Sequence, residues 1–291
     1  MEKKKLLVSF SGGETSAFMG QWLLNNKQDE YEMVFVFANT GQEHEETLEF
    51  VKKCDDYFGF GTHWIESKVH HGIRKGSTYS SVDFDTASRD GEPFEEVIKK
   101  YGIPNRSFPI CTRETKQRPM EYFAKKYFGT LKYYTAIGIR SDEADRMSVR
   151  KTEYRLIYPL VSMIPMTRPQ INSYWRDMPF RLNLKSYQGN CKTCWKKTQT
   201  KLFTIARENP EDFDFMDRME KKYPRVGAEF KKDPNAVDRV FFRESRTAQD
   251  IIEQSKTYKI RGGTIKDEAQ IYEESCEVFS NCGEEQLDLL E

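Results

Sequence analysis

A glycine-rich stretch near the N-terminus has the residue types of a phosphate-binding loop. It lies between a predicted strand, Lys5–Phe10, and a predicted helix, Thr15–Leu24. Glycines let a backbone approach a phosphate closely, and a helix N-terminus offers N–H groups and the positive end of a dipole. A tight turn with a capping serine is the alternative, but the position between a strand and a helix favours phosphate binding. The candidate residues of this stretch are Ser11, Gly12, Gly13, Glu14, Thr15 and Ser16.

Three cysteines are spaced in a way that suits a metal centre. Cys191 and Cys194 are three positions apart, and Cys111 precedes them in the chain. Six cysteines among 291 residues are too few for a disulfide-built fold, so clustered thiols indicate metal or redox chemistry in a reducing compartment. Thiolate ligands select an iron–sulfur cluster or zinc rather than hard cations. A redox pair or buried thiols without a metal are the alternatives.

The elements that must position these residues alternate between strands and helices. This order is typical of βαβ units, and it predicts a parallel twisted sheet flanked by helices, an α/β fold. Lys68–Gly91 has no periodicity, so we predict a long loop there. Further strands are predicted at Met33–Ala38, Thr62–Ile65 and Lys132–Ile139, with a helix at Glu43–Tyr57.

The pattern changes near residue 180, which predicts two parts. Residues 1–180 are expected to form the nucleotide-binding α/β domain, and residues 181–291 a smaller, mainly helical region that contains cysteines and ends in an acidic tail. Residues 266–291 contain one Lys and nine acids; a solvated end and a flap over a basic cleft are the two interpretations. Helices are predicted at Gln170–Met178, Trp195–Glu208 and Pro210–Tyr223.

The overall charge gives no argument for a strongly charged partner, because 46 basic residues balance 46 acidic ones. Five lysines without an intervening acid indicate either a phosphate-facing surface, suited to a polynucleotide, or a solvated helix face. No apolar run approaches the ~20 residues of a membrane span, and the N-terminus lacks the apolar region of a signal peptide, so we expect a cytoplasmic protein with no membrane partner. The five lysines of the possible phosphate-facing surface are Lys185, Lys192, Lys196, Lys197 and Lys201.

The strand-SGGxTS-helix arrangement resembles the PP-loop signature of the ATP pyrophosphatase and phosphoadenosine phosphosulfate (PAPS) reductase superfamily. It is not a Walker loop, because no Gly-Lys-Ser/Thr follows. The resemblance implies that an adenine nucleotide binds by its phosphates at Ser11–Ser16. The commonest form of the superfamily has an Asp where this chain has Thr15, and in ATP-cleaving members that Asp helps to hold magnesium; Thr is familiar among the PAPS-reductase-like members.

Two further segments match the same family in the expected order. Residues 37–50 resemble a strand end, "D/N-T-G" followed by "E-T-x-x-F", that lies beside the adenosine. Residues 138–146 resemble "G-I-R-x-D-E-x-x-R", in which an arginine and its neighbours meet phosphates or sulfate. A planar guanidinium suits an oxyanion. The nucleotide ligands that these segments add are Asn39, Thr40, Gly41, Gly138, Arg140 and Arg146.

The cysteines extend the resemblance. Residues 108–119 resemble the family's "W-C-x-x-x-x-K-x-x-P". In assimilatory reductases that act on adenosine phosphosulfate, a Cys-Cys pair and a Cys-x-x-Cys hold a four-iron cluster near the nucleotide. Ile110 replaces one of those cysteines, so three ligands transfer and the fourth position is filled by a tail cysteine or left open to bind sulfur. The implied metal ligands are Cys111, Cys191 and Cys194, with Cys276 or Cys282 as the fourth. The implied catalytic residues are Lys116, Arg140 and Cys282. The sequence around Cys282 is similar only in part to the segment that carries the family's C-terminal nucleophile.

The resemblance implies a PP-loop enzyme. In the leading hypothesis, ATP is split to AMP and pyrophosphate while an acceptor oxygen is activated as an adenylate, and sulfur associated with a [4Fe–4S] cluster displaces the AMP. A sulfonucleotide reductase, which acts on adenosine phosphosulfate or PAPS, is the rival enzyme, and a nucleotide-binding protein without turnover is the third alternative. Magnesium is a further expected cofactor. The implied partners are a sulfur donor protein or a thiol reductant, and the acceptor is a small molecule, tRNA or DNA.

Overall fold

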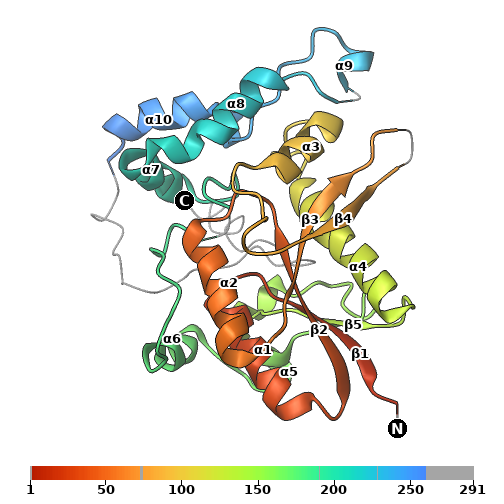
Figure 1. The fold of residues 1–291 in the computed structure, drawn as a ribbon. Coiled ribbons are helices and arrows are strands. Elements are labelled where there is room, and N and C mark those ends of the chain that lie inside the picture. Colours follow the sequence, from red (N-terminus) through yellow and green to blue (C-terminus); the bar gives the residue numbers. More distant parts are fainter. Residues whose placement is uncertain (1, 73–74, 190, 228, 260–291) are drawn as a thin grey trace.

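A six-stranded sheet lies at the centre of the computed structural model, which describes residues 2–72, 75–189, 191–227 and 229–259 (Figure 1). Its strand order is β4-β3-β2-β1-β5-β6. Five strands run parallel, and β4 runs antiparallel to β3 at one edge. The strands are β1 (Lys4–Ser9), β2 (Tyr31–Asn39), β3 (His63–Val69), β4 (Ser77–Val82), β5 (Tyr134–Ala136) and β6 (Leu156–Ile157).

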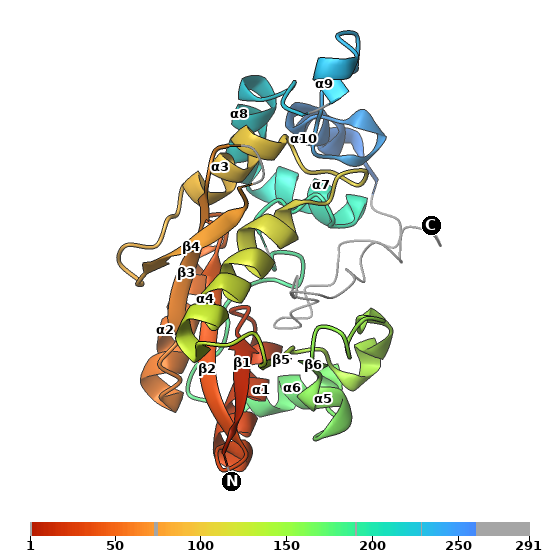
Figure 2. The same ribbon diagram turned by 90° about the vertical axis from the view of Figure 1, so that its right-hand side faces the viewer.

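Helices cover both faces of the sheet, because successive strand residues point to opposite sides. In β1, Leu6 and Val8 belong to a core shared with α1, α2 and α6, whereas Leu7 belongs to a core shared with α4 (Figure 2). Burial on both faces explains why β1 reads as a continuous apolar run. The predicted α/β fold is confirmed. These helices are α1 (Glu14–Lys27), α2 (Glu45–Phe58), α4 (Arg118–Phe128), α5 (Pro159–Ser162) and α6 (Arg168–Arg176).

The prediction of a loop over Lys68–Gly91 is wrong in part. β3 continues to Val69, and Ser77–Val82 forms β4, whose register pairs Ser67 with Tyr79. The sheet is therefore mixed rather than wholly parallel. The serines of β4 hid its strand character, but Thr, Tyr and Val have high strand propensity, and an antiparallel edge strand needs only one buried face.

A second core lies beyond the carboxyl edge of the sheet and consists mainly of helices (Figure 1). Its members come from α7, α8 and α10, and also from α3, which supplies Phe94 and Ile98. The sequence pattern had predicted helices in the regions of α7 and α8. The division at residue 180 stays a prediction, because this core takes residues from both sides of it. The remaining elements are α3 (Glu92–Tyr101), α7 (Gln199–Glu208), α8 (Asp214–Lys222), α9 (Glu229–Lys232), α10 (Ala248–Thr257), the π-helix η1 (Arg113–Gln117) and the 3-10 helices η2 (Ser141–Arg146), η3 (Pro210–Phe213) and η4 (Arg243–Ser245).

No helix among the residues that the structure describes has the length and apolar character needed to cross a membrane.

Candidate functional site

The strand order changes direction at β1, and this places the two halves of the predicted nucleotide site together. β2 pairs with one side of β1 and β5 with the other, so the segments after all three strands leave the same edge of the sheet. A Cβ on Gly138, just after β5, would lie 3.0 Å from Cα of Ser16 in the first turn of α1. Ligands of open α/β sheets bind at such a switch point, beyond the carboxyl ends of the strands.

The loop between β1 and α1 is organised by one hydroxyl group. Ser16 Oγ accepts from Ser11 N at 3.2 Å, lies 2.8 Å from Ser11 Oγ and donates to the Gly13 carbonyl oxygen at 3.0 Å. Gly13 is the N-cap of α1 and has no side chain to cap the first N–H groups. The first turn of α1 therefore has the backbone arrangement of an anion-binding helix terminus.

The packing of the loop requires a glycine at position 12. Its φ is +82°, a conformation that glycine adopts readily, and a Cβ there would lie 2.7 Å from Cγ2 of Thr47 in α2. The loop thus packs directly on α2. By contrast, Gly13 has φ −102° and ψ 159°, which other residues also adopt.

Glu14 has a structural partner rather than an open carboxylate. Arg181 forms two hydrogen bonds with it, at 3.0 and 2.9 Å, and the Leu182 N–H donates to the same carboxylate at 3.2 Å. Burial raises the pKa of Glu14, although Arg181 opposes this shift. The ion pair ties the segment after α6 to the start of α1, and a role for this carboxylate in nucleotide binding stays a prediction, as does that of the neighbouring, buried Thr15.

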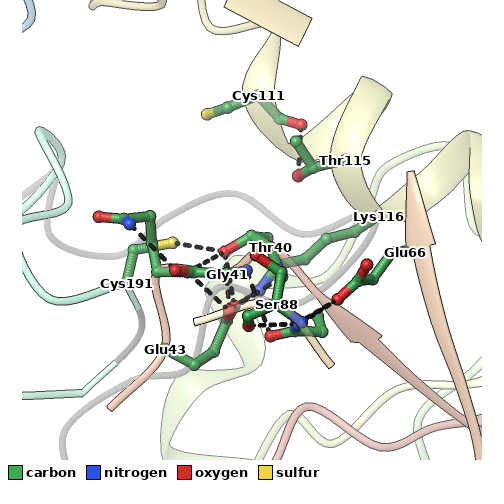
Figure 3. A network of polar contacts seen from close by, with 11 residues as sticks. Thr40, Gly41, Glu43, Glu66, Ser88, Cys111, Thr115, Lys116 and Cys191 are labelled. Atoms are coloured by element: carbon green, nitrogen blue, oxygen red, sulfur yellow. Dashed lines mark hydrogen bonds and ion pairs between the residues drawn. The ribbon is translucent and has the colours of Figure 1, made fainter. Parts of the chain in front are cut away.

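The segment after β2 is held by two carboxylates (Figure 3). Asn39 Nδ2 donates to Glu66 Oε1 at 2.6 Å, and the Gly41 N–H donates to Asn39 Oδ1 at 3.2 Å. The buried Glu43 carboxylate accepts from the Thr40 N–H at 2.9 Å and from Thr40 Oγ1 at 2.8 Å. These bonds satisfy polar groups that would otherwise be costly to bury, and they fix the shape of the loop.

The same loop contacts the cysteine region. Thr40 Oγ1 and Cys191 Sγ are 3.7 Å apart, within hydrogen-bonding distance for sulfur, and the Lys192 N–H donates to the Gln42 carbonyl oxygen at 2.8 Å. Lys116 Nζ lies 3.6 Å from Glu43 Oε1, and both side chains are largely buried. One polar network therefore joins the predicted adenosine side of the site to Cys191 (Figure 3).

The three predicted cysteine ligands line one small cavity of about 30 Å³. Figure 3 shows the sulfur of Cys111 across this space from Cys191 and Thr40. Cys276 and Cys282 lie outside the described residues. Within the described residues, no group of three His, Cys, Asp or Glu side chains could hold a metal ion. The cavity is lined by Thr40, Phe94, Cys111, Thr112, Thr115, Lys116, Cys191, Cys194, Trp195, Lys196 and Met216.

Trp195 and Glu43 are site residues that the sequence analysis missed. The indole of Trp195 is buried in the cavity wall, and its Nε1–H has no hydrogen-bond partner among the residues that the structure describes. An unpaired buried donor is unusual, so this N–H is available to an acceptor in the cavity. The position of Trp195 directly after the Cys-x-x-Cys was a signal of its proximity to the cavity, and Glu43 follows the "N-T-G" segment closely.

The π-helix η1 positions Lys116. Thr115 Oγ1 donates to the Cys111 carbonyl oxygen at 2.9 Å, which joins the start of η1 to the residue that supplies the first thiol. Glu114 in η1 is fully buried and accepts from Ser77 Oγ of β4 at 2.8 Å. A π-helical turn holds an extra residue relative to an α-helix and often occurs at functional sites.

Arg140 and Arg146 form a buried cluster around one carboxylate. Both guanidinium groups pair with Glu143, and Arg140 also contacts the more exposed Asp142 at 3.0 Å. The three buried side chains together have a net positive charge, which the more exposed Asp142 balances, so an anion here would compete with Asp142 for Arg140. The cluster begins two residues after Gly138, at the same edge of the sheet as Ser16. Direct contact of Arg140 or Arg146 with a nucleotide stays a prediction.

His44 next to this site is neutral at pH 7. Burial, and then Lys197 and Lys192, lower its pKa to about 4. Its Nε2 is buried and finds no hydrogen-bond partner within the described part of the chain. The imidazole therefore adds no positive charge to the loop that holds Thr40 and Glu43.

The fold and the loop after β1 define a PP-loop nucleotide-binding α/β protein. Residues 5–176 match the phosphoadenosine phosphosulfate reductase domain. The chain belongs to this family. It is 30% identical over 206 residues to an uncharacterized nin region protein of Escherichia phage lambda, a match that covers 69% of each chain.

Two other relatives are larger proteins. Uncharacterized proteins of Methanocaldococcus jannaschii are each 28% identical, over 54% and 47% of this chain, and the matched part is about a quarter of their length, 27% and 26%. Among solved structures, a phosphoadenylyl-sulfate (PAPS) reductase from Candida auris, in a phosphate complex, is 17% identical with a TM-score of 0.38, over 59% of this chain and 71% of that one.

Proposed function

We propose that this protein binds an adenine nucleotide with its phosphates at the first turn of α1 and uses it for ATP-dependent sulfur transfer. The observation that carries the proposal is the contact between the two parts of the site. Thr40 belongs to the loop expected beside the adenosine, and its hydroxyl lies 3.7 Å from the Cys191 sulfur. A nucleotide-activated acceptor and a sulfur source would therefore meet in one place.

In the proposed reaction, an acceptor oxygen attacks the α-phosphorus of ATP and pyrophosphate leaves. A sulfur nucleophile then replaces the adenylated oxygen, and AMP leaves with that oxygen. The first turn of α1 would bind the phosphates, and the buried Arg140–Glu143–Arg146 cluster would offset their negative charge. Lys116, held near Glu43, would orient the anionic groups between the nucleotide and the thiols.

Thiolates are the ligands that an iron–sulfur cluster or zinc prefers, which supports a cluster here, with zinc as the alternative; the described side chains as they stand form no group that could hold a metal ion, so the three thiols would have to approach one another to bind it. Cys111, Cys191 and Cys194 would hold it, and Lys116 and Lys196 in the same wall would balance anionic thiolates. A cluster bound there would supply a site for the sulfur that is transferred. Magnesium would accompany ATP at the phosphate site.

Nucleotide binding is tested by Gly13→Val. Gly13 has a backbone conformation open to other residues, so the added side chain should block the approach of phosphates without unfolding the protein. We expect calorimetry to show loss of ATP binding and circular dichroism to show a native spectrum. Unchanged ATP affinity in a folded variant would mean that the loop is only a turn.

The cluster is tested by metal analysis of anaerobically purified protein. We expect brown protein that contains iron and acid-labile sulfide, and loss of both in Cys191→Ser. Stoichiometric zinc without iron would assign the site a structural role. Protein without any metal would contradict the cluster.

The reductase alternative makes a different prediction for Cys282. A sulfonucleotide reductase needs a reactive tail thiol that an external thiol later releases. In this chain, Glu284 and Glu285 follow Cys282, and nearby acids disfavour a thiolate. We expect little or no sulfite from adenosine phosphosulfate or PAPS. Rapid thiol-dependent sulfite release that disappears in Cys282→Ser would favour the reductase instead, and nucleotide binding without any turnover would favour the non-catalytic alternative.

A further inference from the structure

A second, much larger cavity of about 1030 Å³ lies next to the cysteine cavity. It is enclosed by the loop after α3, the first residues of α7, the segment 237–246 and the end of α10. Lys196 lines the small cavity and Lys197 lines the large one, so consecutive residues separate the two. A ligand in the large cavity would lie beside the proposed sulfur site.

The charge of the large cavity is positive. Asp238 and Glu244 are the acids in its wall; Asp238 is 2.7 Å from Arg225, and the Glu244 side chain is 77% exposed and 3.7 Å from Arg246. Basic side chains outnumber them. They are Arg106, Lys197, Arg239, Arg243 and Arg246. Arg239 also pairs with Glu229, outside the wall, and the buried Lys197 Nζ donates to the Tyr187 carbonyl oxygen at 3.0 Å.

Several of these arginines are held in place by neutral groups. Arg243 Nη2 donates to the Lys196 carbonyl oxygen at 3.3 Å, and Arg246 Nε donates to the Arg243 carbonyl oxygen at 3.0 Å. These carbonyls help to position both guanidinium groups, and Arg246 also lies near the exposed carboxylate of Glu244. Arg106 is exposed at the mouth and has no carboxylate partner among the described residues. The cavity thus presents preorganised positive charge to a ligand.

The wall also contains strained backbone. Glu244 and Ser245 have φ values of +59° and +55°, and both line the cavity. Residues other than glycine rarely adopt this conformation, and such strain concentrates where a structure clamps a ligand. Tyr258, at the end of α10, adds a partly exposed aromatic ring to the same wall.

We propose that the large cavity binds single-stranded nucleic acid, and that this strand is the acceptor in the sulfur transfer proposed above. Positive grooves that contain an aromatic ring follow a phosphate backbone and stack exposed bases. The volume lies at the upper end of the range of small-molecule sites, and a concave site admits a strand more easily than the surface of a folded acidic protein. The acceptor role rests on the proposed function, whereas strand binding can be measured without it.

The test is fluorescence anisotropy of the full-length protein, purified anaerobically, with a labelled single-stranded oligonucleotide offered as DNA and as RNA. We expect affinity to fall linearly with salt on logarithmic axes. Arg106→Glu should weaken binding about tenfold or more, since it reverses a charge at the mouth. Lys125→Glu, the same charge change on exposed α4, is the matched control and should change the affinity less than twofold.

Three results would overturn the proposal. They are no binding of either oligonucleotide by the wild-type protein, equal effects of Arg106→Glu and Lys125→Glu, and displacement of the oligonucleotide by an equal charge of poly-glutamate, which would indicate an acidic protein ligand.

The Gly13→Val variant should lose ATP binding but keep oligonucleotide binding, so failure of the nucleotide site can be distinguished from failure of the large cavity. Mass spectrometry after incubation with ATP and sulfide should show sulfur in place of oxygen in the strand; an unmodified strand despite ATP cleavage would exclude it as the acceptor.

Discussion

At the residue scale, glycines in the loops of this protein serve different purposes. The sequence pattern attributes Gly12 and Gly13 alike to phosphate approach. In the structure, Gly12 has a left-handed φ and its Cα faces α2, whereas Gly13 caps α1 in an extended conformation. Adjacent glycines in a motif can therefore have separate physical causes: packing on α2 accounts for Gly12, whereas phosphate approach stays the proposed role of Gly13.

Replacing Gly12 should destabilise the fold. In Gly12→Ala, the new Cβ would lie 2.7 Å from Thr47 Cγ2 at a φ of +82°, so both overlap and backbone strain contribute. We expect a loss of about 2–4 kcal/mol in the free energy of unfolding, measured by urea denaturation.

Gly59→Ala is the control for this variant, because Gly59 also has a left-handed φ, +71°, but nothing lies within 4 Å of its added Cβ. It should lose only about 1 kcal/mol, the cost of the backbone conformation alone. Equal losses in the two variants would show that contact with Thr47 has no role.

At the element scale, the sequence predicted the parallel strands and the helices between them better than the antiparallel edge. The centres of β1 and β2 are continuous apolar runs, which indicate burial on both faces, and α2 has a clear helical period, whereas α1 is buried at nearly all positions of its first half and has none. β4 has three serines and a mixed burial pattern, so its strand character depends on pairing with β3 rather than on local sequence.

The contact between α8 and α10 should make stability depend on pH. Glu220 in α8 accepts from the Phe241 N–H at 3.0 Å and from the Ala248 N–H, at the start of α10, at 2.8 Å. Burial raises the pKa of Glu220 from 4.5 to about 7. The folded protein then binds this proton more tightly than the unfolded chain does, so the free energy of unfolding falls as pH rises from about 4.5 to about 7.

Glu220→Gln removes this titration. Compared with the variant, the wild-type protein should lose about 3 kcal/mol of stability across that range. Urea denaturation at several pH values measures the difference between the two proteins, and parallel curves would show that Glu220 does not titrate there. The variant also loses one acceptor, which lowers its stability by a similar amount at every pH and does not change the slope.

At the scale of the whole molecule, the second core joins the two halves of the chain. The ring of Phe215 in α8 stacks on that of Phe94 in α3, with centroids 5.6 Å apart and an angle of 28° between the planes. A Cβ on Gly91 would overlap the ring of Phe215. The sequence suggested two parts from a change of pattern, but side-chain contacts between distant segments leave no mark on local periodicity.

Unfolding should therefore occur in one transition. We expect Phe215→Ala to lower the free energy of unfolding by about 3–5 kcal/mol, because a buried ring is removed, while the chain still unfolds cooperatively by circular dichroism and by tryptophan fluorescence. Phe230→Ala in α9, a helix with no buried residues, should change it by less than about 1 kcal/mol. Two separate transitions would instead support independent domains that meet near residue 180.

The sequence placed Cys111, Cys191 and Cys194 together through the spacing and family resemblance of two motifs, and the structure brings them to one cavity, whose other lining residues the sequence did not indicate. Trp195 belongs to the wall, and Glu43 lies behind it, 3.6 Å from Nζ of the lining residue Lys116. Cys276 and Cys282 lie outside the described residues.

The π-helix η1 makes the cavity sensitive to the length of the chain between Cys111 and Pro119. A π-helical turn behaves as a one-residue insertion in an α-helix. Deleting one residue would let the segment wind as continuous α-helix and would rotate everything before the deletion by about 100° relative to α4. Cys111 and Lys116 would then no longer face the same space, even with every motif letter retained. In an alignment of such chains, a single gap at η1 would therefore be more informative than a substitution.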